Sequence, residues 1–98
     1  MARVIWTEPA LSELDAVADH IALDKPGAAR AFVQKVFHKV DLLKRFPQLG
    51  TRPSEIRGML YRQLWVPPCR IFYRLHKRQI FIVSVIRAEK ELKENFLK

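Results

Sequence analysis

Two apolar stripes at helical spacing, joined by almost no linker, are the feature that most constrains the fold of this chain. The second stripe runs from Ala29 to Leu43, and the first consists of Ala10, Leu14, Val17 and Ile21. The residue before a proline avoids the helical region, whereas proline suits the first turn of a helix. Lys25-Pro26 therefore ends one helix and begins the next. We expect the two helices to form an antiparallel hairpin.

The other regular segments have the composition of β-strands. Arg3–Trp6 is a short apolar run ahead of the first helix, for which Thr7 is the expected N-cap. Beyond a loop over 47–58, three strand-like runs follow, at Met59–Val66, Arg70–Leu75 and Ile80–Ile86. The last run is apolar on both faces, which predicts a central strand. The charged tail from Ala88 to Lys98, with Leu92 and Phe96 four residues apart, predicts a short C-terminal helix.

These elements together predict an α+β fold. We expect an N-terminal strand, an antiparallel helical hairpin packed on a small antiparallel β-sheet, and a short C-terminal helix, all in one domain over residues 1–98. The apolar content of 49% fits a folded globular chain. Because the hairpin must bury its apolar stripe against one face of the sheet, the other face is left open.

Positive charge is concentrated in the second half of the chain. Of the formal net charge of +8, the stretch from Lys44 to Arg78 supplies nine basic residues against the single acid Glu55. Aromatic residues are interleaved with these charges. Such a field points to a polyanionic or acidic partner, the alternative being chance clustering on a solvated face.

The middle strand-like run places arginines on one face of the expected sheet. Since side chains alternate along a strand, Arg70, Phe72 and Arg74 share a face, and Tyr73 packs on the other. Two arginines beside an aromatic ring are poor core material but suit a phosphate, a carboxylate or another ring. Trp65 on the preceding run is expected either at the edge of the core or in contact with a partner.

The residue content of the chain predicts where the protein is located in the cell and whether it holds a cofactor. The single cysteine, Cys69, allows no disulfide framework, and no apolar run approaches the roughly 20 residues that span a bilayer. We expect a cytoplasmic protein with no membrane partner. No pair among the three histidines has the spacing of metal ligands, so we expect neither a metal nor another cofactor.

The order and spacing of several motifs resemble the RelE/ParE family of toxins from type II toxin–antitoxin pairs. The strongest piece is the run Arg70-Ile71-Phe72-Tyr73-Arg74, followed by an apolar strand ending near Arg87. The other matching segments are Val4-Ile5-Trp6-Thr7, Pro26-x-Ala28-Ala29, Phe46-Pro47, Gly50-Thr51-Arg52-Pro53, Arg57-Gly58 and Tyr61-Arg62. The resemblance covers nearly the whole chain and implies the fold described above.

The resemblance implies one of two activities. RelE-like members cleave messenger RNA in the ribosome, and Arg62, Arg70 and Arg87 match basic positions of that catalytic set. The C-terminal tyrosine that those members use as acid or base has no counterpart here, since the tail holds neither tyrosine nor histidine. ParE-like members lack the nuclease set and poison DNA gyrase by binding it.

We therefore predict a ParE-like toxin that binds gyrase and is neutralised by an acidic antitoxin. We expect the antitoxin to lay an amphipathic segment on the same basic surface. The alternatives are a ribosome-dependent messenger RNase and a non-toxic basic binding module. The binding residues predicted for this surface are Arg62, Trp65, Arg70, Phe72, Arg74 and Arg87.

Overall fold

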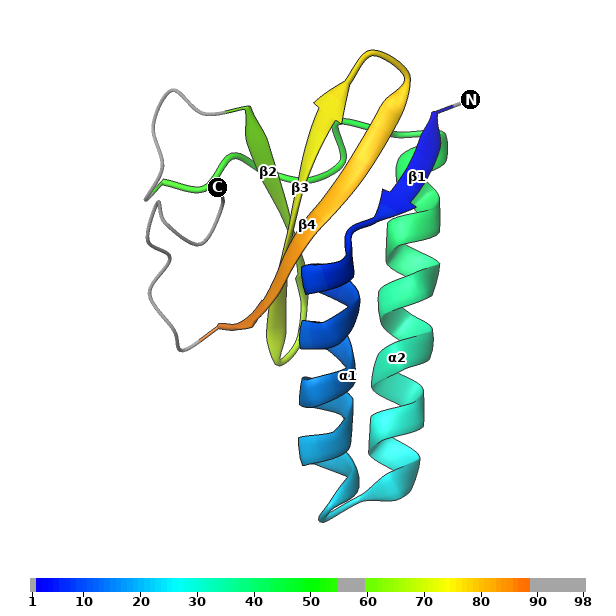
Figure 1. Cartoon of the computed structure of the whole chain (residues 1–98), viewed down its shortest axis with the longest axis vertical. Coiled ribbons are helices and arrows are strands. Elements are labelled where there is room, and N and C mark those ends of the chain that lie inside the picture. Colours follow the sequence, from blue (N-terminus) through cyan, green and yellow to red (C-terminus); the bar gives the residue numbers. More distant parts are fainter. Residues whose placement is uncertain (1, 55–59, 89–98) are drawn as a thin grey trace.

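Two helices lie against one face of a four-stranded sheet (Figure 1). The computed structural model describes residues 2–54 and 60–88. Its elements in chain order are β1 (Arg3–Trp6), α1 (Glu8–Ala22), α2 (Pro26–Asp41), the 3₁₀ turn η1 (Leu42–Lys44), β2 (Tyr61–Val66), β3 (Cys69–His76) and β4 (Gln79–Arg87). The predicted α+β class, the strand ahead of the helices and the three later strands are confirmed. The predicted C-terminal helix lies outside the described residues.

The helical hairpin forms where the sequence predicts it. The Thr7 side chain caps α1 by accepting a hydrogen bond from the Ala10 amide (3.3 Å), and it also donates to the Ile82 carbonyl of β4 (2.8 Å). Pro26 opens α2, which passes into η1 at Leu42. Within the described part of the chain, neither helix is long and apolar enough to cross a membrane.

The strand order in the sheet is β1-β4-β3-β2, so β4 is a central strand as predicted. β2, β3 and β4 pair in antiparallel fashion, but β1 pairs with β4 in parallel. The predicted antiparallel sheet of three consecutive strands is confirmed, and β1, whose pairing was not predicted, makes the sheet mixed. Periodicity predicts a strand but not the direction in which it joins a partner far along the chain, because both directions bury the same faces.

The two faces of the sheet have different surroundings. The back face, which the helices cover, joins Ile71, Tyr73 and Ile82 to the apolar stripes of α1 and α2 in the main core. The front face, which points away from the helices, carries Arg70 and Arg74 as predicted.

Candidate binding surface

The two arginines of β3 are held over aromatic rings on the front face. The Arg70 guanidinium carbon lies 5.0 Å from the centroid of the Phe72 ring, and that of Arg74 lies 4.6 Å from the centroid of Phe81. Arg70 Nε also donates to Gln63 Oε1 (2.8 Å). A guanidinium over a ring is attracted by the electrons of the ring face, and its planar fork of N–H donors matches a carboxylate or a phosphate.

Trp65 lies next to Arg70 at the outer edge of the sheet. The two residues are direct cross-strand partners, and the Trp65 side chain is 51% exposed. A hollow of about 350 Å³ opens here, lined in part by Trp65, Arg70, Gln63 and Thr51. Of the two possibilities left open for Trp65, the exposed fraction favours contact with a partner.

Phe72 does not contribute to the binding surface as predicted. Its side chain is fully buried, and with Ile86 it forms a second apolar cluster, against which Tyr61 and Val83 pack. The register between β3 and β4 shifts at Phe72/Tyr73, which leaves Val83 as an extra residue of β4. The front face is therefore apolar at its centre, and Phe72 is a support for Arg70 rather than a ligand contact.

Arg62 lies on the back face, where it stabilises a loop. It alternates with the buried Leu64 and Val66 of β2, and its guanidinium donates to the Gly50 carbonyl (2.8 Å). Arg62 therefore does not share a face with Arg70, as one basic surface would require. Arg62 is the cross-strand partner of Tyr73 on the back face, whereas Arg70 is the cross-strand partner of Trp65 on the front face.

The loop that Arg62 holds is fixed to the back face by Tyr73, whose predicted packing role is confirmed. The Tyr73 hydroxyl accepts from the Gly50 amide (2.8 Å) and donates to the Pro47 carbonyl (2.9 Å). A Cβ on Gly50 would lie 2.6 Å from the Gln63 carbonyl oxygen, so the close approach requires glycine. Burial raises the pKa of Tyr73, partly offset by the Gly50 hydrogen bond and the positive charge of Arg62.

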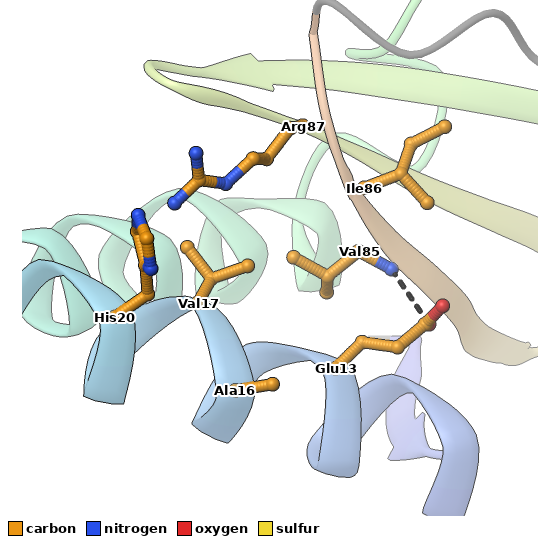
Figure 2. A pocket seen from close by; sticks show the side chains of 7 residues that line it. All are labelled: Glu13, Ala16, Val17, His20, Val85, Ile86 and Arg87. Atoms are coloured by element: carbon orange, nitrogen blue, oxygen red, sulfur yellow. Dashed lines mark hydrogen bonds between the residues drawn. The ribbon is translucent and has the colours of Figure 1, made fainter.

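Arg87 lies on the back face near α1, away from Arg70. It is two residues from the buried Val85, and Figure 2 shows it extending toward His20 of α1. Arg62, Arg70 and Arg87, the catalytic residues predicted for the RelE-like alternative, therefore do not surround a single site. Arg70 lies on the front face of the sheet, and the other two lie on the back face. In the described part of the chain, no three His, Cys, Asp or Glu side chains are grouped so as to hold a metal ion.

Glu13 has a role that the sequence analysis missed. Its position on the polar side of α1 predicts a solvated carboxylate. Instead, it accepts a hydrogen bond from the Val85 amide (3.1 Å), shown in Figure 2, and another from the Ser84 hydroxyl (3.1 Å). β1 pairs only as far as Ile82, so among the described residues no strand pairs with β4 beyond that point on this side. The lengths of the two strands could have predicted this role. β1 has four residues and β4 has nine, so β1 cannot pair with the whole of β4.

Comparisons with known proteins agree with this fold. The family model described as "ParE toxin of type II toxin-antitoxin system, parDE" matches residues 4–92. The chain is 34% identical over 89 residues to the putative toxin Y4kP of Sinorhizobium fredii, covering 91% of each protein. It is 31% identical over 88 residues to toxin RelE2 of Caulobacter vibrioides, covering 90% of this chain and 97% of that one.

A solved structure is similar as well. The structure titled "Chromosomal ParDE TA system from P. aeruginosa" superposes with a TM-score of 0.77 at 31% identity, covering 91% of this chain and 98% of that one. The family match and the two relatives each extend over most of the sequence. This chain belongs to the ParE family of toxins from type II toxin–antitoxin systems.

Proposed function

We propose that this toxin acts by binding DNA gyrase, and that the front arginines Arg70 and Arg74 are part of the contact. The observation that carries the proposal is the separation of Arg62, Arg70 and Arg87. Arg70 lies on the front face, Arg62 is bonded to Gly50 on the back face, and Arg87 lies beside α1. A phosphate-cleaving site needs its cations and its acid or base around one phosphate.

The front surface has the properties of a binding site. Arg74 is fixed over the ring of Phe81, and Trp65 offers a half-exposed aromatic side chain near Arg70. Arginine and tryptophan are the residue types most enriched among the strong contacts of protein interfaces. A toxin that binds gyrase works in the cytoplasm, so this location is part of the same proposal.

The test is to incubate the purified toxin, without antitoxin, with gyrase and relaxed plasmid. We expect loss of supercoiling and accumulation of cleaved plasmid after protein denaturation. Unchanged supercoiling at excess toxin would reject the proposal. New cuts in translated messages after induction would instead favour a ribosome-dependent RNase.

A further inference from the structure

Gln63 of β2 contacts Arg70 on the front face of the sheet. Gln63 is the cross-strand partner of Phe72, and Arg70 is that of Trp65, so Gln63 and Arg70 are diagonal neighbours on one face. Diagonal neighbours in an antiparallel pair of strands meet only when their side chains are long. Arg70 Nε donates a hydrogen bond to Gln63 Oε1 (2.8 Å). Gln63 is therefore joined directly to one of the two arginines of the proposed gyrase contact.

The backbone around Gln63 is held along both edges of β2. The Gln63 amide donates to the Thr51 carbonyl (2.7 Å), and the Gln63 carbonyl accepts from the Thr51 amide (3.0 Å). On the other edge, β3 pairs with β2 over the whole range Tyr61–Val66. The side-chain amide of Gln63 therefore extends from a backbone position that is fixed on both sides.

Two contacts restrain the Arg70 guanidinium from different directions. The centroid of the Phe72 ring lies 5.0 Å from the guanidinium carbon, and Phe72 is itself fully buried. The Gln63 oxygen accepts from Nε, which lies at one edge of the planar guanidinium. A long side chain that is already held in its binding orientation loses less conformational entropy when a partner binds.

We propose that Gln63 is a positioning residue, which orients Arg70 so that its Nη groups meet a carboxylate of gyrase. The Gln63 contact uses the N–H group of Nε, so the donors toward the carboxylate are those of the two Nη atoms. The carboxylate would enter the hollow of about 350 Å³ that Arg70 lines together with Trp65 and Thr51. This inference rests on the proposed function and adds to it the residue that orients the contact.

The test is a double-mutant cycle, measured as the concentration of purified toxin that blocks supercoiling by gyrase. We expect Gln63→Leu, which removes the acceptor, to raise this concentration about fivefold, and Gln34→Leu at an exposed position of α2 to change it less than about twofold. Combined with Arg70→Ala, Gln63→Leu should add less than about a twofold loss, because the residue that it orients is gone. Combined with Arg74→Ala, it should still cost about fivefold. Melting temperatures check that every variant is folded.

An equal loss from Gln63→Leu with and without Arg70 would overturn the inference, since Gln63 would then contact gyrase itself or only stabilise the fold. Inhibition by folded Gln63→Leu at the wild-type concentration would overturn it as well. In either case the wild type still inhibits gyrase, so the proposed function stands. A wild-type toxin that leaves supercoiling unchanged would reject both.

A second measurement tests the orienting contact in the toxin alone. Nuclear magnetic resonance follows hydrogen exchange at Arg70 Nε, whose N–H group is bonded to Gln63. We expect this exchange to be at least about fivefold faster in Gln63→Leu than in the wild type, and unchanged in Gln34→Leu. Equal exchange in Gln63→Leu and the wild type would overturn the inference whatever the target of the toxin.

Discussion

The back and front faces of the sheet use polar side chains in opposite ways. On the back, Arg62, Tyr73 and Glu13 direct their polar atoms inward, to the backbone of a loop or of a neighbouring strand. On the front, the guanidinium groups of Arg70 and Arg74 lie over the aromatic rings of Phe72 and Phe81. The polar groups of the back face therefore stabilise the fold, whereas the front face holds two arginine charges over aromatic rings, where we propose that the target binds.

The strongest test of the back face is Val36→Asp in α2. Val36 is fully buried in the main core, so an unpaired carboxylate there should cost about 4 kcal/mol or more. We expect most of the protein to be unfolded at 37 °C, as measured by circular dichroism. Arg30→Asp, which adds a carboxylate at an exposed position of the same helix, is the control. Equal melting temperatures for the two variants would mean that α2 does not pack as described.

Tyr73→Phe tests the attachment of the loop to the back face. It removes the hydroxyl that joins Pro47 to Gly50, and the expected loss of unfolding free energy is about 2 kcal/mol. Tyr61→Phe is the matched control. Tyr61 is half-buried against the cluster of Phe72 and Ile86, and its variant should lose less unfolding free energy than Tyr73→Phe. Urea denaturation measures both, and a larger loss from Tyr61→Phe would contradict the comparison.

The same variant carries a pH prediction. Burial raises the pKa of Tyr73, so the folded state favours the protonated phenol. The stability from this shift is complete below the unfolded pKa of about 10 and is lost as pH rises through the folded value. We therefore expect the stability difference between wild type and Tyr73→Phe to narrow above about pH 10. A difference that widens there would contradict the inward position of this hydroxyl.

Glu13→Ala is expected to have the smallest effect of the back-face changes. It leaves the Val85 amide and the Ser84 hydroxyl without their acceptor, at a cost of about 1 kcal/mol. Hydrogen exchange should show faster exchange at the Val85 amide than in Asp15→Ala, which alters an exposed acid of the same helix. Unchanged exchange at Val85 would mean that this edge of β4 is protected by other groups.

The elements that the sequence predicts well are those with strong local signals. The proline at position 26 and the apolar repeats predict both helices, and the two-faced apolar run predicts the central strand. The alternation in β3 correctly separates Arg70 and Arg74 from Tyr73.

The misses all depend on contacts between distant segments. Phe72 is buried against Ile86 of β4. Arg62 lies on the back face, where it pairs with Tyr73 and donates to the Gly50 carbonyl. The parallel pairing of β1 and the strand-capping role of Glu13 likewise follow from how far one strand extends along another. The local sequence pattern does not predict contacts between segments that are far apart along the chain.

The most direct test of the division between the two faces is gyrase inhibition by the double variant Arg70→Ala/Arg74→Ala. Each cation–π contact contributes only about 0.5–1 kcal/mol, so the variant should remain folded with a small drop in melting temperature. We expect the concentration of this variant that blocks supercoiling to be at least about ten times that of the wild type. Inhibition at the wild-type concentration by this folded variant would contradict the assignment of the front face to the target.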